Sequence, residues 1–163
     1  MNLSLRFATI LLTGMVCTST FAGDVVTINV SGTLTQTPCI LTSSKTLSAN
    51  FGRILSDQIN NVSPIDIPIT LYCPANSSLN VSIKASGVYP ISPPTMATTT
   101  KANLIYMFTW KSNGTLAYVD GTQRKLTNLS GNVNLGLTAR LAALSAQTEG
   151  IFTGTSVITL EYL

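Results

Sequence analysis

Residues 26–34 of the chain read VTINVSGTL, a stretch in which apolar and polar residues alternate. Its apolar series is Val26, Ile28, Val30, Gly32 and Leu34. A period of two is typical of a β-strand with one buried face. Similar alternation recurs at residues 65–71, 79–83, 133–141 and 156–162, and residues 104–110 are rich in strand formers. The sequence therefore predicts an all-β fold.

Turn-forming sequences separate these segments. Asn113-Gly114, Asp120-Gly121 and Ser130-Gly131-Asn132 are strong breakers, and residues 87–100 hold three prolines in what we expect to be a long loop. Pro68 cannot donate to a ladder, so it predicts an edge or a bulge within residues 65–71. No window of a dozen residues has helical spacing. Many short strands with regular turns indicate a single β-sandwich domain.

The first 22 residues predict a secretory signal peptide. A short segment that ends with the cation Arg6 precedes an apolar stretch at residues 7–16, and small residues lead to Ala22. This order is typical of a signal peptide, and the apolar stretch is shorter than the about 20 residues that span a bilayer. We expect cleavage after Ala22, which leaves Gly23 as the first mature residue. A buried N-terminal helix and a membrane anchor are the alternatives.

The cysteine count depends on that cleavage. Cys17 leaves with the signal peptide, so the mature chain holds only Cys39 and Cys73. An even pair in an exported chain predicts one disulfide, which stabilises the fold by about 4 kcal/mol through loop closure. The alternative, a metal site with two cysteine ligands, lacks partners because the chain contains no histidine.

Composition argues against several classes of function. Charged residues make up 9% of the chain and its net charge of +3 forms no run, which argues against a nucleic-acid partner. The six acids are scattered, and no phosphate loop, nucleophile elbow or zinc-site spacing occurs. We therefore expect no enzyme, no cofactor and no metal site, although carboxylates on separate strands can converge in space.

Five Asn-X-Ser/Thr triplets leave the source of the chain open. They begin at Asn61, Asn76, Asn80, Asn113 and Asn128. In a secreted eukaryotic immunoglobulin-like protein they would accept glycans, whereas in a bacterial protein rich in Thr, Ser and Asn they arise from composition. Attached sugar would distinguish the two.

Both ends of the mature chain resemble the subunits of chaperone–usher fimbriae, and most closely the minor subunits of type 1 pili. At the front, the alternating stretch 24–34 runs into Pro38-Cys39, with Gly32 on its apolar face. At the back, Gly150 is fourteenth from the end and Tyr162 is penultimate, as in the C-terminal motif of that family. Phe152, Ile158 and Leu160 are the apolar residues between them. The conjunction with a signal peptide and two cysteines makes the resemblance specific, although the middle of the chain is generic.

This resemblance implies an incomplete immunoglobulin-like β-sandwich of six strands plus an N-terminal donor strand. Residues 1–22 would be the signal peptide, 23–34 the donor extension and 35–163 the pilin domain. Val26, Ile28, Val30, Gly32 and Leu34 would enter the groove of a neighbouring pilin subunit by β-strand addition. The groove would lie beside the last strand, and its residues, which a periplasmic chaperone also contacts, would be Gly150, Phe152, Ile158, Leu160, Tyr162 and Leu163. An outer-membrane usher would exchange the chaperone strand for the next extension, which places the chain in a fimbria on the bacterial surface.

Patterning alone favours a simpler interpretation, in which residues 26–34 pair within their own domain, as most first strands do. The resemblance favours donation to a neighbour instead.

The kind of subunit is a separate question. A two-domain tip adhesin does not fit the about 141 mature residues, and the front stretch favours a minor or adaptor subunit that contributes to cell adhesion over a major rod subunit or a terminator. The alternative is a single-domain fimbrial adhesin that binds a host receptor directly, which an exposed Tyr106, Phe108 and Trp110 cluster would favour. Otherwise a host receptor would be reached only through the fibre.

Overall fold

The computed structural model describes residues 26–34 and 37–163. The expected signal peptide, its Cys17 and the mature residues 23–25 lie outside this part of the chain. Contacts divide the chain into two units at the Leu34–Thr35 peptide bond. Residues 26–34 form no helix or strand, so the regular structure described below belongs to the second unit.

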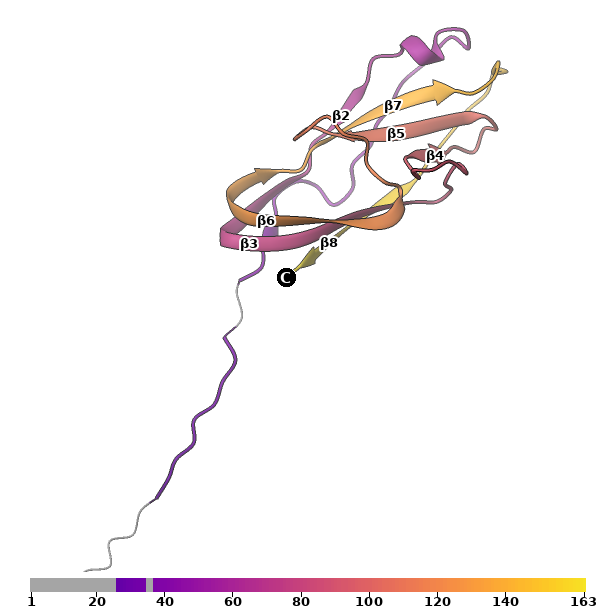
Figure 1. Ribbon diagram of the computed structural model, residues 1–163. Helices are drawn as coiled ribbons and strands as arrows, with labels where there is room; N and C mark the ends of the chain where they lie inside the picture. The colour runs from indigo at the N-terminus through magenta and orange to yellow at the C-terminus, as the bar shows by residue number, and fades with distance from the viewer. Residues whose placement is uncertain (1–25, 35–36) are drawn as a thin grey trace, which may run out of the picture. The chain divides into compact units, whose positions relative to one another are not determined.

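That second unit is a sandwich of two antiparallel sheets, which confirms the predicted all-β class (Figure 1). One sheet contains β1 (Ile40–Leu41), β3 (Thr70–Ala85), β6 (Asp120–Asn134) and β8 (Ser156–Tyr162), with β8 and β1 on the same side of β3. The other has the order β2 (Ile65–Ile67), β7 (Leu137–Ala143), β5 (Leu104–Trp110) and β4 (Met96–Thr98). The described residues hold eight strand segments rather than the six expected, and three of the eight, β1, β2 and β4, have only two or three residues. One 3₁₀ turn, η1 (Ile59–Asn61), precedes β2, and no described helix is long and apolar enough to cross a membrane.

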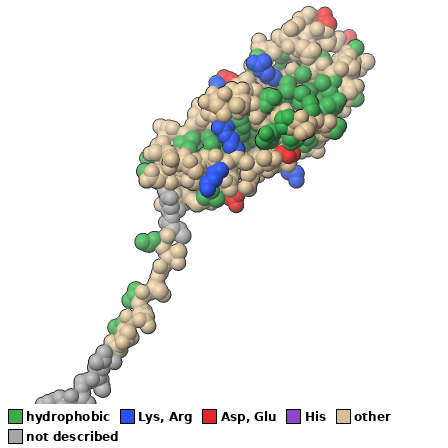
Figure 2. Space-filling view, in the orientation of Figure 1, with side chains coloured by type: hydrophobic (Ala, Val, Ile, Leu, Met, Phe, Trp, Pro, Cys, Tyr) green, Lys and Arg blue, Asp and Glu red, His purple; other side chains and the backbone are tan. Residues whose placement is uncertain are grey.

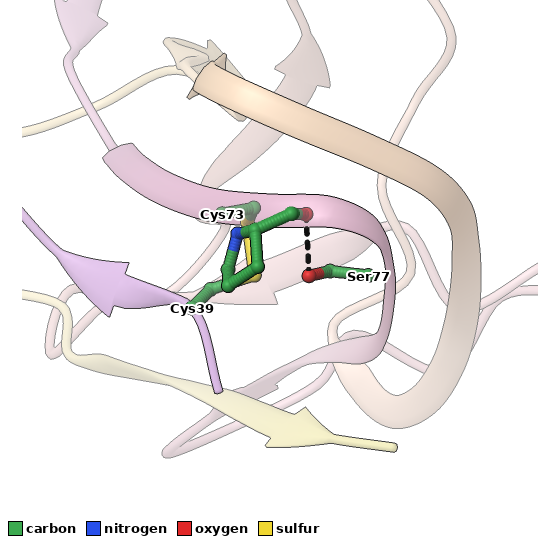
Figure 3. The surroundings of a disulfide bond; sticks show 4 residues. Cys39, Cys73 and Ser77 are labelled. Carbon is green, nitrogen blue, oxygen red and sulfur yellow. Dashed lines mark hydrogen bonds between the residues drawn. A yellow bond between two sulfur atoms is a disulfide. The ribbon is translucent and has the colours of Figure 1, made fainter. Parts of the chain in front are cut away.

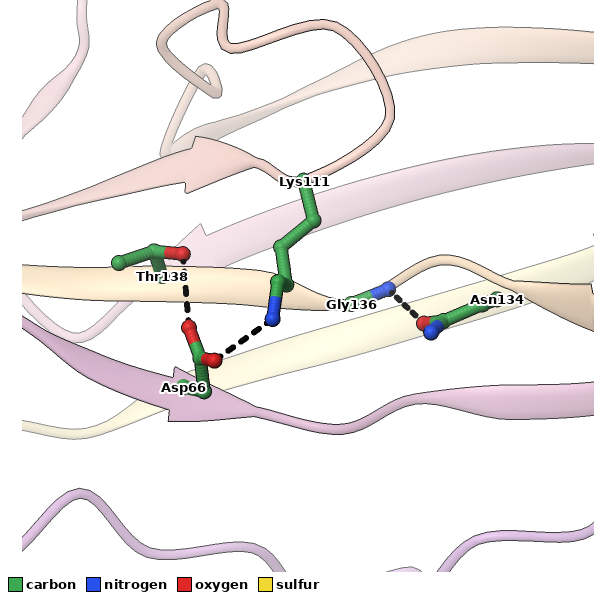
Figure 4. Close-up of polar contacts among 5 residues, drawn as sticks. All are labelled: Asp66, Lys111, Asn134, Gly136 and Thr138. Carbon is green, nitrogen blue, oxygen red and sulfur yellow. Dashed lines mark hydrogen bonds and ion pairs between the residues drawn. The ribbon is translucent and has the colours of Figure 1, made fainter.

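Two segments that we predicted as continuous strands change sheets instead. Residues 65–71 break at Pro68, between β2 in one sheet and β3 in the other, and residues 133–141 break at Gly136, between β6 and β7. The breaks lie together, since the Leu135 amide donates to the Ile69 carbonyl at 2.8 Å. At the second break the Gly136 amide donates to Asn134 Oδ1 at 2.8 Å, and a Cβ on Gly136 would lie 2.9 Å from that oxygen (Figure 4). Pro68 and Gly136 thus mark the corner at which both chains cross between the layers.

The predicted turns at Asp120-Gly121 and Ser130-Gly131-Asn132 are wrong, because both lie within the 15-residue β6. Gly121, Gly131 and Asn128 have positive φ angles of 98°, 63° and 57°. The pairing of β6 with β3 contains three register shifts, so turn-type residues are accommodated here as bulges. The expected loop at 87–100 is also partly regular, because it contains β4.

The core lies between the two sheets. Leu71, Leu79, Val81 and Ile83 project into it from β3, and Leu104, Phe108 and Leu137 from the other sheet. Tyr106, Phe108 and Trp110 are only 8%, 7% and 6% exposed, so the aromatic stripe of β5 belongs to the core.

Candidate functional site

β8 is the strand around which the candidate site is built. It pairs with β3 in seven consecutive positions, from Ser156 opposite Ala85 to Tyr162 opposite Leu79, without a register shift. Within residues 37–163, it has no strand partner on its other edge. The N–H and C=O groups along that edge are therefore available to another strand.

A hollow of about 640 Å³ runs beside this edge. It is lined by Ile158 and Leu160 of β8, by Leu47, Ala49 and Phe51, and by core residues of both sheets. Ile158 and Leu160 are half-buried and pack against the core, whereas the adjacent Val157 is exposed. The hollow is thus a groove with an apolar lining rather than a closed cavity.

A second hollow of about 840 Å³ adjoins the first. The two share Ala49, Asn50, Phe51 and Phe152 as lining residues, and the second is bounded further by residues 52–57 and 147–151. Phe152 therefore stands where the two hollows meet. The groove extends past the first residue of β8 towards Gly150.

The structure brings together most of the residues predicted for the groove. Phe152, Ile158 and Leu160 line it, and Gly150 lies at its far end with a φ of +138°, a conformation that L side chains rarely adopt. A Cβ on Gly150 would also lie 3.3 Å from Lys101 Nζ, which donates to the Glu149 carbonyl. Tyr162, the last residue of β8, and Leu163, which follows it, have exposed fractions of 38% and 56%. They line neither hollow.

A second group of lining residues was missed by sequence reasoning. Leu47, Ala49 and Phe51 alternate with Ser48 and Asn50, so a period of two was present there. We did not identify it because the run is short and no strand forms in it.

The residues predicted to donate are uncovered. Val26, Ile28, Val30 and Leu34 are 82%, 81%, 92% and 102% exposed, and no heavy atom lies within 4 Å of a Cβ built on Gly32. Figure 2 shows hydrophobic side chains standing apart from one another along this segment. An alternating segment with this much uncovered apolar surface is typical of a segment that pairs with another surface.

The predicted disulfide is present and joins Cys39 to Cys73, with Cα atoms 4.2 Å apart (Figure 3). Both cysteines are buried. The bond attaches the first residues of the domain to β3, where the Ser77 hydroxyl donates to the Pro74 carbonyl at 2.7 Å. A covalent link therefore fixes the point at which the N-terminal segment enters the sandwich.

Two carboxylates of the domain, Asp66 and Asp120, make local structural contacts. Lys111 Nζ donates to Asp66 Oδ2 at 2.6 Å and the Thr138 hydroxyl donates to Asp66 Oδ1 at 3.1 Å, which ties the end of β5 to β2 and β7 (Figure 4). These hydrogen bonds, from Lys111 first and Thr138 second, lower the pKa of Asp66. The Thr122 amide likewise lowers the pKa of Asp120. Among residues 26–34 and 37–163, no group of three His, Cys, Asp or Glu side chains could hold a metal ion.

Comparison with known proteins identifies the family of the chain. A family model described as "Fimbrial protein" matches residues 28–163. The chain belongs to the fimbrial protein family. The predicted resemblance to chaperone–usher fimbrial subunits is therefore confirmed, and with it the fimbrial location on the cell surface to which such subunits are exported.

Solved structures share the fold of this fimbrial protein. The P pilus rod subunit PapA is 22% identical with a TM-score of 0.64, over 78% of this chain and all of that chain. A chain from a chaperone–usher pilus structure, described in terms of rod uncoiling, is 19% identical with a TM-score of 0.63, over 88% and 99% of the two chains. A search of curated protein sequences found no significant match.

Proposed function

We propose that this fimbrial subunit polymerises by strand addition. In this proposal residues 23–34 of one subunit lie along the unpaired edge of β8 in the next, and Val26, Ile28, Val30 and Leu34 enter its groove. The observation that carries it is the combination, in one chain, of an open apolar groove beside a regular strand edge and a separate segment with uncovered alternating apolar side chains. Contacts of this head-to-tail kind do not close on themselves and therefore build filaments.

The magnitudes suit a durable fibre. Burial of four large aliphatic side chains contributes roughly 1.5–3 kcal/mol each, or about 6–12 kcal/mol before ladder hydrogen bonds and ordering costs. Gly32 has no side chain, so the acceptor groove needs no pocket at the position where Gly32 would lie. The second hollow, beyond Phe152, has room for a side chain at one end of the donor strand.

An open groove before assembly is an aggregation hazard, which gives a chaperone a physical role. We infer that a periplasmic chaperone lends a strand to β8, contacts Tyr162 and Leu163, and is replaced at an outer-membrane usher. The likeness to a chaperone–usher pilus chain supports this assignment at the level of the fold.

Within the fibre we place the chain as a minor or adaptor subunit that contributes to cell adhesion through the whole assembly. The support is the resemblance of residues 24–34 to the extensions of type 1 minor subunits. A single-domain adhesin is the weaker candidate, because the aromatic stripe that would favour it is buried in the core. A host receptor is therefore assigned to the fibre and not to a surface of this chain.

A peptide experiment tests the proposal. A chain that begins at Gln36 should aggregate alone and be rescued by a peptide of residues 23–34. Ile28→Asp in the peptide should abolish rescue, because a buried unpaired carboxylate costs several kcal/mol. Asn29→Asp is the matched control, since Asn29 lies on the polar face of the alternation and its change should be tolerated. A truncated chain that is fully stable alone and gains nothing from the peptide would contradict strand addition.

A further inference from the structure

Tyr106 makes contacts that its place in the core does not explain. It lies on β5 in one sheet, yet its hydroxyl lies 2.9 Å from the Thr155 carbonyl and 2.8 Å from Ser156 Oγ, at the start of β8 in the other sheet. A phenol has one hydrogen, so when Tyr106 donates to Thr155 the Ser156 hydroxyl donates to Tyr106. One buried side chain therefore bonds across the sandwich to the first residue of β8, the strand with one unpaired edge.

The ring of Tyr106 is held at both ends. The Phe108 ring packs against it edge to face, with centroids 5.5 Å apart and an interplanar angle of 74°. At the other end, a Cβ on Gly154 would overlap Tyr106 Cε1, so glycine lets the backbone pass directly against the ring. These contacts fix where the hydroxyl lies.

The backbone bonded to this hydroxyl is where the chain crosses between the sheets. The Thr153 carbonyl accepts from the Thr100 amide at 2.8 Å, just after β4, and the Thr155 carbonyl accepts from the Ser86 amide at 2.9 Å, just after β3. From β5 in the other sheet, Tyr106 bonds to Thr155 and Ser156 at the end of this crossing. Its phenol therefore spans the gap between the two sheets on the open side of the sandwich.

This span lies in the groove itself, since Tyr106, Thr155 and Ser156 line the hollow of about 640 Å³. The apolar walls of an unfilled groove gain free energy by approaching each other, because contact removes their surface from water. β8 resists that approach through a ladder on one edge only. The Tyr106 ring, held between the two sheets at the first residue of β8, opposes closure of the groove at the point where the ladder begins.

We propose that Tyr106 is a positioning residue of the acceptor groove, holding the first residues of β8 across the gap so that the unpaired edge stays open and in register for a donor strand. This role rests on the proposed strand addition. Tyr106 acts through β8 and contributes no backbone group to the ladder. If Tyr106 only filled the core, its ring would be sufficient and its hydroxyl would make no difference to the groove.

Tyr106→Phe separates these roles, because it keeps the ring and removes the hydroxyl. The Thr155 carbonyl keeps its bond from Ser86, so the change leaves that acceptor satisfied. Ser156→Ala removes the second partner and carries the test if Tyr106→Phe does not fold. Tyr118→Phe, at an exposed tyrosine, is the matched control.

Two measurements on the mature chain decide the matter: amide hydrogen exchange at residues 155–158 without peptide, and the affinity for a fluorescent peptide of residues 23–34. Tyr106→Phe and Ser156→Ala should each accelerate exchange at the start of β8 and weaken peptide binding, by roughly three- to tenfold, while Tyr118→Phe changes neither. Exchange and affinity that match the unmodified chain in both variants would overturn the proposal. If neither the unmodified chain nor any variant binds the peptide, strand addition fails. In that case the exchange rates at residues 155–158 alone support or overturn the positioning role.

Discussion

Removal of the Cys39–Cys73 disulfide should cost the domain a large part of its stability. The two residues are separated by 34 positions, so the bond closes a long loop in the unfolded chain. With an entropy of about 2.1 + 1.5R ln n cal/mol/K and n near 34, the loss is about 13 cal/mol/K, or about 4 kcal/mol at 25 °C. Small domains have about 5–15 kcal/mol in total, so the double variant Cys39→Ala/Cys73→Ala should lose between about a quarter and four fifths of its stability.

The assay is urea unfolding of the mature chain bound to the peptide of residues 23–34, so that the groove is filled in every sample. The expected result is a lower midpoint with an equal or steeper slope, because the unfolded chain without the cross-link is less compact and exposes at least as much surface. Reduction of the unmodified protein should reproduce the shift. A loss below about 1 kcal/mol would refute the reasoning, since it would mean that the unfolded chain gains almost no freedom when this loop is opened.

Two further predictions concern single side chains. Gly154→Ala should lower the free energy of unfolding by about 1–3 kcal/mol, because the new Cβ overlaps the Tyr106 ring; Gly32→Ala, which has no heavy atom within 4 Å, should leave thermal unfolding of the free subunit unchanged. Asp66→Asn should remove a small, salt-screened contribution to stability: because the folded pKa of Asp66 is lowered, this contribution is fully present above the unfolded carboxyl pKa near 3.8 and is lost as pH falls through the folded value. Urea midpoints of the two proteins should therefore differ at about pH 6 and converge at about pH 2, and a difference that grows on acidification would show that the sign is wrong.

The sequence predicted the strands better than their ends. Alternation identified β8 and the second half of β3 because a half-buried strand needs a period of two. The same alternation runs on through Pro68 and Gly136, where the chain passes from one sheet to the other while its apolar residues still face the shared core. Local patterning is blind to that crossing, because it is defined by contacts between residues 67–70 and 134–137 that are distant in sequence.

The candidate site was predictable only in part for a similar reason. Phe152, Ile158 and Leu160 follow from strand alternation and a family motif in the last fourteen residues. Leu47, Ala49 and Phe51 line the groove without forming a strand. The contact of Tyr106 with Ser156 joins residues 50 positions apart. Neither leaves a local signature strong enough to identify from one sequence.

The proposal that β8 is the acceptor strand is also supported by a comparison of the described strand edges. An exposed edge promotes unwanted pairing, and proteins blunt such edges by keeping them short or by bulges. β2 and β4, the outer strands of one sheet, have three residues each, and β1 has two. β6 is long, but Asn128 and Gly131 adopt positive φ angles within it and its pairing with β3 shifts register three times. β8 has seven residues in unbroken register beside an apolar groove, so it is the described edge on which an incoming strand could form a regular ladder and bury side chains at the same time.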